Sequence, residues 1–344
     1  MTLTQAAQQM AAEMAEQPEV LARVAARFAE LTDRVRGLTD GRVPGVAFLA
    51  RGSSDNAALL GRYAVEISAG VPTSLVAPSI LTSYHGQPER FAGWLVVALS
   101  QSGRTPEIID VAARFRSCGA HVVAITNDAG SPLAAEADLG IALEAAAELA
   151  VPATKTVTGQ MLATLVIANA LGRPAITAAE LDQIPAAMAE ILGDVDPIRR
   201  AAAAVAPHER MAVVARGACY AAALETALKL QETTGILAHG FSTADFRHGP
   251  IAVCGPSTPA LLFTGSGPAD NDTRDLRPRL SQAGALVVVA GTGPDSQIGW
   301  PEVSGMADCL LATVRGQQLA LHVALARGVD PDNPAGLSKV TLTH

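Results

Sequence analysis

An internal repeat limits what this chain of 344 residues can fold into. Three pairs of segments resemble each other at offsets of 165, 164 and 165 residues: 46–59 with 211–224, 94–103 with 259–267, and 120–125 with 285–290. Three matches at nearly one offset are hard to obtain by chance, because unrelated segments would show unrelated spacings. We therefore predict two copies of one domain.

Each copy alternates short apolar stretches with helical ones. In the first copy, strands are expected at residues 45–50, 74–77, 95–99, 120–126 and 139–143. Such alternation is typical of right-handed βαβ units, which build a parallel sheet covered by helices on both faces. The predicted fold class is therefore α/β, and ligands are expected beyond the carboxyl ends of the strands.

The length and composition suit two domains with substantial cores. Hydrophobic residues make up 49% of the chain and charged residues 17%, which argues against disorder. We expect an N-terminal helical segment over residues 1–40, the first domain over 41–195, the second over 196–328 and a C-terminal loop over 329–344.

Charge and cysteine usage exclude several classes of protein. The net charge is −8 and no basic tract is present, which argues against a nucleic-acid partner. The four cysteines are scattered without a Cys-x-x-Cys pair, so neither a disulfide framework nor a zinc site is suggested. The first residues are unlike a signal peptide, and no apolar run approaches the roughly 20 residues of a membrane span. We expect a cytoplasmic protein with no membrane partner and no metal.

The stretch at residues 95–109 combines a strand, a hydroxyl-rich turn and a helix. The apolar residues end at the turn 100–103, and Thr105 can then cap a helix that has Pro106 in its first position. Backbone N–H groups, hydroxyls and the positive end of a helix dipole would then surround one small volume, which suits a phosphate. On its own the stretch also fits an ordinary polar β–α turn of an α/β protein.

The two copies differ at their turns. Ser53 and Ser54 of the first copy are replaced by Ala218 and Cys219 in the second, and the Ser-Gln-Ser-Gly turn becomes Thr-Gly-Ser-Gly at residues 264–267. Hydroxyl groups are therefore lost from one turn of the second copy. The first copy is predicted to receive the phosphate, while the second keeps the scaffold and contributes other groups.

One helix of the second copy carries three charged residues on a single face. Glu225, Lys229 and Glu232 are spaced at i, i+4 and i+7. Without further context, a solvated stripe of salt bridges is the usual explanation of this pattern.

Other polar residues have ordinary explanations when each is taken alone. Thr154 and Lys155 would open an N-capped surface helix. His248 would be structural or exposed, and Lys339 would belong to a frayed polar tail.

Considered together, these segments resemble the sugar isomerase (SIS) family, in particular the isomerase domains of glucosamine-6-phosphate synthases. The shared strings occur in the expected order: Ser-Gln-Ser-Gly-x-Thr at 100–105, Glu-x-x-Val followed by Thr-Lys at 148–155, Ala-Leu-Lys-Leu-x-Glu at 227–232, His-Gly-Pro at 248–250 and Asp-x-Asp-x-Pro-x-x-Leu-x-Lys at 330–339. The resemblance extends over residues 16–343. It implies tandem duplicated SIS domains, each a parallel sheet flanked by helices in a flavodoxin-like three-layer sandwich.

The resemblance also implies which residues hold a phosphosugar. The expected substrate-binding residues are Gly52, Ser53, Ser54, Ser100, Gln101, Ser102, Thr105, Glu148, Val151, Ala153 and Ser338. Within residues 148–155, two positions depart from the family pattern. Pro152 is unusual, and Ala153 stands where the synthases typically have a serine, which removes one hydroxyl contact.

Four catalytic residues follow from the same resemblance. Lys229 would assist with charge near C1, and Glu232 would carry a proton between C1 and C2. His248, which in the family typically reaches a neighbouring subunit's site, would assist opening of the sugar ring. Lys339 would either close the site or form a Schiff base with the open-chain sugar, and the sequence does not choose between the two. No cofactor is implied.

The reaction expected from the resemblance is deamination. Residue 2 is threonine, where the synthases carry the nucleophilic cysteine of a glutaminase domain, so the chain would lack their ammonia source. The resemblance then implies aldose–ketose isomerisation and deamination of glucosamine 6-phosphate to fructose 6-phosphate and ammonia. A galactosamine 6-phosphate deaminase and a fructose-amino acid 6-phosphate deglycase are alternatives, and a non-catalytic phosphosugar sensor is a more distant one. The family also implies a homodimer with a shared active site.

Overall fold

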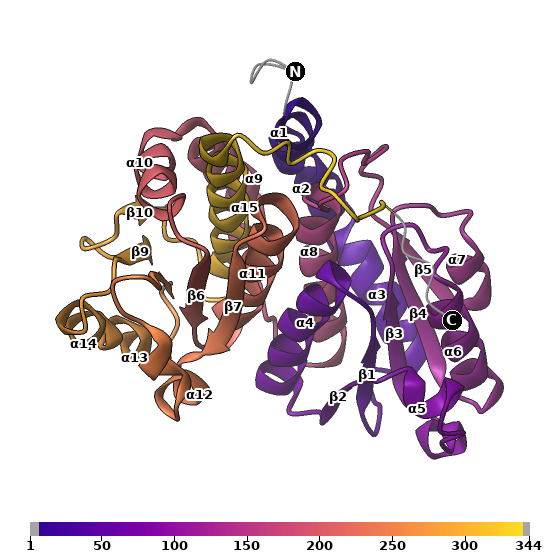
Figure 1. Cartoon of the computed structure of the whole chain (residues 1–344). Helices are drawn as coiled ribbons and strands as arrows, with labels where there is room; N and C mark the ends of the chain where they lie inside the picture. Colours follow the sequence, from indigo (N-terminus) through magenta and orange to yellow (C-terminus); the bar gives the residue numbers. More distant parts are fainter. Residues whose placement is uncertain (1–6, 340–344) are drawn as a thin grey trace. The chain divides into compact units, whose positions relative to one another are not determined.

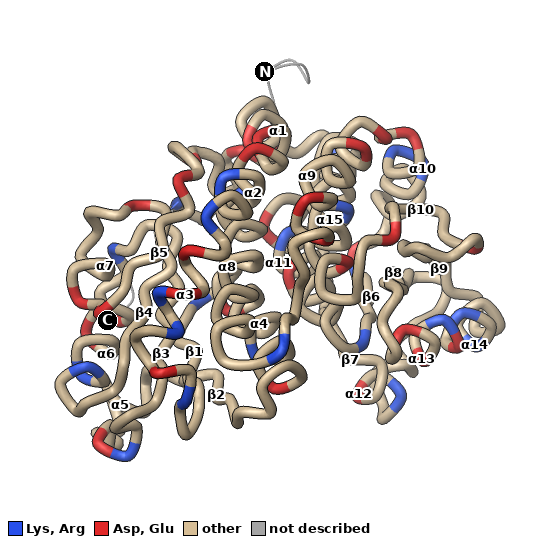
Figure 2. The backbone as a smooth tube through the Cα atoms, turned by 180° about the vertical axis from the view of Figure 1, so that it is seen from behind, with Lys and Arg blue, Asp and Glu red and all other residues tan. Residues whose placement is uncertain are grey.

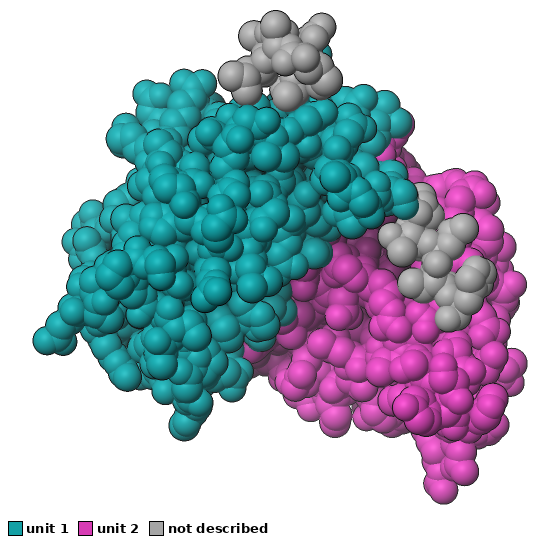
Figure 3. All heavy atoms as spheres, in the orientation of Figure 1, with its two compact units in different colours: residues 1–18, 149–154, 179–339 teal, residues 19–148, 155–178, 340–344 magenta. Residues whose placement is uncertain are grey.

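The computed structural model describes residues 7–339, which form two compact units (Figure 3). Within that range, unit 1 comprises residues 7–18, 149–154 and 179–339, and unit 2 comprises residues 19–148 and 155–178. These boundaries differ from the expected ones, because residues 149–154 and 179–195 belong to unit 1 rather than to the first domain. Tertiary contacts explain the difference: Ala150 packs in a cluster with Met10, Met14 and Leu321 of unit 1.

The sheet of unit 2 has five parallel strands. In chain order they are β1 (Val46–Leu49), β2 (Thr73–Leu75), β3 (Leu95–Leu99), β4 (His121–Thr126) and β5 (Leu139–Ala142). Their order in the sheet is β2-β1-β3-β4-β5, with Val46 opposite Leu95 and Leu95 opposite His121. The central strands β1 and β3 are buried along their whole length, as expected for a parallel sheet covered on both faces.

Helices cover both faces of this sheet (Figure 1). They are α2 (Gln17–Ala26), α3 (Phe28–Thr39), α4 (Ser53–Ala69) and α8 (Lys155–Leu171) on one side, and α5 (Ser79–Thr82), the 3₁₀ turn η1 (Pro88–Phe91), α6 (Pro106–Ser117) and α7 (Pro132–Glu136) on the other. Gly61 lets α4 lie close to α8, because a Cβ there would stand 2.7 Å from Phe48 and 2.9 Å from Thr164.

Unit 1 repeats the topology of unit 2. Its strands are β6 (Arg210–Ala215), β7 (Leu237–Ser242), β8 (Ala260–Thr264), β9 (Val287–Gly291) and β10 (Ile298–Gly299). They are parallel and follow the order β10-β9-β8-β6-β7. Counted within each unit, both sheets have the strand order 2-1-3-4-5, which is the flavodoxin-like order. The structure thus confirms the predicted fold class and duplication.

The helices of unit 1 also lie on both faces of its sheet. They are α1 (Gln8–Ala15), α9 (Ala178–Gly193), α10 (Asp196–Val205), the 3₁₀ turn η2 (Gly217–Cys219), α11 (Tyr220–Thr234), α12 (Thr243–Arg247), the 3₁₀ turn η3 (Pro250–Val253), α13 (Asn271–Arg274), α14 (Leu276–Gln282) and α15 (Ala307–Arg327). Helices α11 and α15 pack closely, because Gly316 has no side chain where a Cβ would meet the Thr226 hydroxyl.

Basic and acidic residues are interspersed along the backbone of both units (Figure 2). None of the helices within residues 7–339 combines the length and apolar character needed to span a bilayer. In the same range, no three His, Cys, Asp or Glu side chains are grouped so as to hold a metal ion.

Candidate functional site

The turn between β3 and α6 offers backbone donors at the start of a helix. Thr105 is the N-cap of α6 and Pro106 its first residue, as predicted. The N–H groups of Gln101, Ser102 and Thr105 donate to no other group in the part of the chain that the structure describes. Since α6 runs for 12 residues, its positive end adds to the attraction of these donors for an anion.

Two hydroxyl groups frame the same turn. The Ser100 Oγ lies 3.4 Å from the Thr105 Oγ1 and accepts a hydrogen bond of 3.2 Å from the N–H of Gly103. Thr105 makes no side-chain capping bond to α6, so its hydroxyl is directed to Ser100 instead. Ser100 is buried, whereas Gln101, Ser102 and Thr105 are half-buried. The arrangement suits a ligand that accepts several hydrogen bonds.

Glycine is required at position 103. Gly103 has a φ of +61°, and a Cβ there would stand 2.2 Å from the Ser131 Oγ. Two backbone hydrogen bonds hold the turn in place. The Asn127 N–H donates to the Gln101 carbonyl at 3.1 Å, and the Leu133 N–H donates to the Gly103 carbonyl at 3.1 Å. The donors of the turn are therefore held in place before any ligand arrives.

The turn between β1 and α4 is short, because α4 already begins at Ser53. Gly52 takes a φ of +57° and reverses the chain at once, and its carbonyl accepts the N–H groups of Asp55 and Asn56. Ser53 and Ser54 consequently lie in the first helical turn, where Ser54 is buried and Ser53 half-buried.

An ion pair that sequence reasoning missed joins these two turns. The Arg51 Nε and Nη2 donate to the Glu107 Oε2 at 3.2 and 3.0 Å, and the Glu107 side chain is only 7% exposed. The duplicated positions in unit 1, Arg216 and Asp272, also form an ion pair. The Arg-Gly dipeptide occurs in both copies of the repeat, so the sequence could have pointed to the arginine as a shared feature. Nothing in the sequence pointed to its carboxylate partner.

Glu148 caps the start of α8 within unit 2. Its Oε1 accepts the Thr156 N–H at 3.1 Å and its Oε2 accepts the Thr156 hydroxyl at 2.7 Å. Thr154 and Lys155 are buried as well, so the explanation as a surface helix is wrong. Val151 and Ala153, which belong to unit 1, are half-buried.

The charged face of α11 is buried rather than solvated. The Lys229 Nζ lies 3.4 Å from the Glu225 Oε1 and 2.5 Å from the Glu232 Oε2. Lys229 and Glu225 are 1% and 0% exposed, because α11 packs against β6, β7 and α15. Glu232 keeps 22% exposure and is therefore the member of this cluster that a ligand can reach.

Opposite charges hold Lys229 in its ammonium form. Burial alone lowers the pKa of Lys229, but the carboxylates of Glu225 and Glu232 raise it more, so its pKa lies above the ordinary value. A proton donor beside Glu232 is thus present at neutral pH, which suits chemistry in which negative charge develops on a neighbouring oxygen.

The remaining predicted catalytic residues lie elsewhere in unit 1. His248 directly follows α12 and is exposed, and its ring makes no hydrogen bond or ion pair within residues 7–339. Lys339 is half-buried and Ser338 is exposed in the loop that follows α15. The end of the expected C-terminal loop, residues 340–344, lies outside the described residues.

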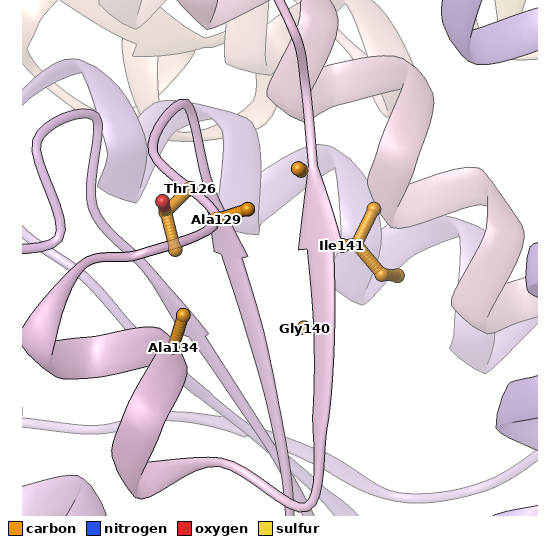
Figure 4. Close-up of a pocket in the computed structure, with 6 residues that line it drawn as sticks. Thr126, Ala129, Ala134, Gly140 and Ile141 are labelled. Carbon is orange, nitrogen blue, oxygen red and sulfur yellow. The ribbon is translucent and has the colours of Figure 1, made fainter.

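A cavity of about 170 Å³ in unit 2 lies between β4, α7 and β5 (Figure 4). Its lining consists of Thr126, Ala129, Ala134, Gly140, Ile141 and Ala142. Thr126 supplies the only side-chain hydroxyl among them, and that hydroxyl donates to the Asp128 carbonyl at 2.8 Å. None of the predicted site residues lines this cavity, so it does not compete with the β3–α6 turn as a phosphate site.

The turn after β8 in unit 1 corresponds to the β3–α6 turn but is occupied by carboxylates. The Ser266 N–H and hydroxyl both donate to the Asp308 Oδ2 at 2.6 Å, and the Gly267 N–H donates to the Asp270 Oδ2 at 2.6 Å. Both carboxylates are buried, and burial raises the pKa of Asp270 to about 6.

Comparison with known proteins agrees with this duplicated architecture. The SIS domain model matches residues 44–170 and 205–299, one segment in each copy. Glutamine–fructose-6-phosphate aminotransferase (isomerizing) of Methanothermobacter thermautotrophicus is 32% identical over 318 residues, which are 89% of this chain and 53% of the relative. The enzyme of that name from Zymomonas mobilis is 29% identical over 96% of this chain and 58% of its own length. The chain therefore spans about half the length of the curated relatives it matches.

Solved structures show the same fold over their whole length. A Silicibacter pomeroyi protein assigned as a phosphosugar isomerase superposes with a TM-score of 0.85 and 29% identity, covering 94% of this chain and 99% of that one. Glucosamine-6-phosphate deaminase of Thermotoga maritima has a TM-score of 0.70 at 22% identity, covering 95% and 100%, and supports the fold alone. With an SIS match in each of its two duplicated sheets, this chain belongs to the SIS-domain family.

Proposed function

We propose that this protein isomerises and deaminates an aminosugar 6-phosphate, with glucosamine 6-phosphate as substrate and fructose 6-phosphate and ammonia as products. The observation that carries the proposal is the turn at residues 100–105, where N–H groups that have no acceptor among the described residues meet two hydroxyls at the start of α6. Such a turn suits the phosphate that all substrates of this class share. The names of the relatives, which concern fructose 6-phosphate and phosphosugars, support the same substrate class.

In the proposed reaction, Glu232 moves a proton between two neighbouring carbons of the open-chain sugar. It removes the proton from C2 and returns it to C1, so that the aldehyde becomes a hydroxymethyl group and the amine becomes an imine at C2. Water then adds to the imine, and ammonia leaves as the ketone forms. Lys229, which bonds to Glu232 at 2.5 Å, would stabilise negative charge on the sugar oxygen during the proton transfer.

His248 and Lys339 complete the proposal. The exposed ring of His248 would assist ring opening, and its lack of a partner within the described chain supports a role toward another subunit. Lys339 would close the site or bond to the sugar carbonyl carbon. We further propose a homodimer in which the two chains share their active sites.

The decisive variant is Glu232→Gln, which keeps the shape of the side chain but removes the base. Ammonia release from glucosamine 6-phosphate should fall at least about 100-fold, the lower range for general acid–base catalysis. Binding of fructose 6-phosphate, measured by calorimetry, should be retained. Glu89→Gln, at an exposed position of η1, serves as the matched control and should keep full activity. Full activity of Glu232→Gln would refute the assigned role.

A substrate panel tests the reaction class. Galactosamine 6-phosphate and fructose-amino acid 6-phosphates should bind through the same turn but release their amines more slowly than glucosamine 6-phosphate releases ammonia. Tight binding of every member without turnover would instead identify a phosphosugar sensor.

A mixing experiment tests the shared site. Subunits carrying Glu232→Gln and subunits carrying His248→Ala are each expected to be inactive. If each site uses the histidine of the partner chain, mixed dimers should regain about a quarter of the wild-type activity, because half of the dimers are mixed and each has one intact site. No recovery after verified subunit exchange would contradict sharing.

A further inference from the structure

The first helix of unit 1 receives its N-terminal cap from the far end of the chain. The residue at the N-cap position of α1 is Ala7, which lies in the left-handed region at φ 70° and has no side chain able to cap. Instead, the Gln9 N–H donates to the Asp332 Oδ2 at 3.0 Å and the Met10 N–H donates to the Asp332 Oδ1 at 2.8 Å. Asp332 is 4% exposed, so this is a buried, charge-assisted cap.

Asp332 also holds the loop in which it lies. Its own N–H donates to the Asp330 Oδ1 at 3.1 Å, and its carbonyl accepts the Val151 N–H at 3.2 Å. The flanking Pro331 and Pro334 are buried. Figure 1 shows the loop after α15, in yellow, running past α1 at this point. The loop is therefore docked at Asp332, a few residues before Ser338 and Lys339.

Helix α1 also binds residues 149 and 150 through a carboxylate of its own. Glu13 is buried, and its Oε1 accepts the N–H groups of Leu149 and Ala150. Met10 and Met14, on the buried side of the same helix, pack in a cluster with Ala150. One short helix thus contacts both the segment that contains Val151 and Ala153 and the loop that leads to Ser338, three residues that the family resemblance implies contact the sugar.

We propose that Asp332 is a positioning residue for the reaction. By capping α1 it fixes the C-terminal loop, so that Lys339 is presented in the conformation that acts on the substrate. This inference rests on the proposed function for the role of Lys339. The docking itself does not depend on that function, because it is built from contacts within unit 1.

The test compares Asp332→Ala with a variant that weakens α1 without touching the loop. Ala12→Gly, at an exposed position of α1, lowers helix propensity and leaves the cap intact. Asp332→Ala should lower kcat for ammonia release by about 10- to 100-fold, the order expected when a reacting group is misplaced by about 1 Å. Ala12→Gly should keep the wild-type kcat even though it lowers the Tm. Asp332→Asn, which keeps one acceptor oxygen, should fall between the two.

A second readout reports on the loop without using the reaction. Limited trypsin cleavage after Lys339, followed by intact mass, should be at least about 10-fold faster in Asp332→Ala than in Ala12→Gly or the wild type, because a released loop opens more often. Equal cleavage rates in Asp332→Ala and Ala12→Gly would overturn the docking role. Faster cleavage with an unchanged kcat would overturn the positioning role. If the wild type releases no ammonia from any substrate, the proposed function fails, while the cleavage rates still decide whether Asp332 docks the loop.

Discussion

Two equivalent turns, one in each unit, satisfy the same kind of backbone donor in opposite ways. After β3 in unit 2, the N–H groups of Gln101, Ser102 and Thr105 have no acceptor within the described chain. After β8 in unit 1, the N–H groups of Ser266 and Gly267 donate to buried carboxylates of the protein itself. The donors of one turn are thus available to an external anion, whereas those of the other turn are taken up by carboxyl groups of its own unit.

The difference extends to the helix that follows each turn. In unit 2 the turn leads into α6, an unbroken helix of 12 residues, whereas in unit 1 it leads into α13, a helix of four residues that Asp275 separates from α14. The first helical segment after the turn of unit 1 therefore has the weaker dipole. That turn also has fewer donors to offer an anion, because Asp308 and Asp270 already accept the N–H groups of Ser266 and Gly267.

The largest expected effect on ligand binding comes from placing a carboxylate within the turn of unit 2. Ser102→Asp retains an acceptor for the Arg104 N–H, which now bonds to the Ser102 hydroxyl at 3.2 Å, so the turn should survive. The added charge would repel a phosphate by about 1–4 kcal/mol at 4 Å. We expect the Kd for fructose 6-phosphate, measured by calorimetry, to rise about 100-fold.

Ser83→Asp is the matched control, because it adds the same charge to unit 2 at an exposed position away from the turn. It should change the Kd less than about two-fold after screening by salt. Similar Kd values for Ser102→Asp and the wild type would show that the phosphate binds elsewhere.

The next expected effect is on the pH dependence of stability, and it comes from the buried carboxyl group of Asp270 in unit 1. Burial raises the pKa of Asp270 to about 6, above the ordinary value of 3.8, so the native protein holds a proton that the unfolded chain has already lost. Stability therefore falls as the pH rises from about 4 to about 6, and the full penalty, about 3 kcal/mol, is present at pH 7.

Asp270→Asn should remove this dependence. The free energy of unfolding of the wild type, measured from urea titrations followed by tryptophan fluorescence, should decrease relative to that of the variant between pH 4 and pH 7. Parallel profiles of the two proteins over this range would contradict the assignment. Binding of fructose 6-phosphate should be unchanged, since the variant lies in the unit without the phosphate turn.

The smallest effect tests a feature that both copies share. Arg51→Met breaks the ion pair with Glu107 beside the phosphate turn, and Arg216→Met breaks the equivalent pair with Asp272 in unit 1. Because both arginines are partly exposed, each pair contributes about 0.2–1 kcal/mol. Arg51→Met should raise the Kd for fructose 6-phosphate about two- to five-fold, whereas Arg216→Met should leave it unchanged. If both variants changed the Kd equally, the ion pair of Arg51 would have no specific role in phosphate binding.

The duplication, both parallel sheets and the strand, turn and helix that begin at Leu95 could be predicted from sequence because each depends on local patterns. Pro106 at a helix start, for instance, is set by the geometry of its own ring. The burial of Lys229 could not be predicted in this way, because spacing gives the face of a helix but not what packs on it. The partners of Arg51 and Ser266 were missed for the same reason, since Glu107 lies 56 residues and Asp308 42 residues away along the chain.

The cap of α1 has a consequence for protein synthesis. Helix α1 is translated before the strands of either sheet, but the carboxylate that caps it becomes available only when residue 332 has been made. The described residues of unit 2, by contrast, have all been made once residue 178 has been translated. The growing polypeptide therefore carries α1 without the Asp332 cap while the strands of both units are synthesised, and the C-terminal loop completes unit 1 only afterwards.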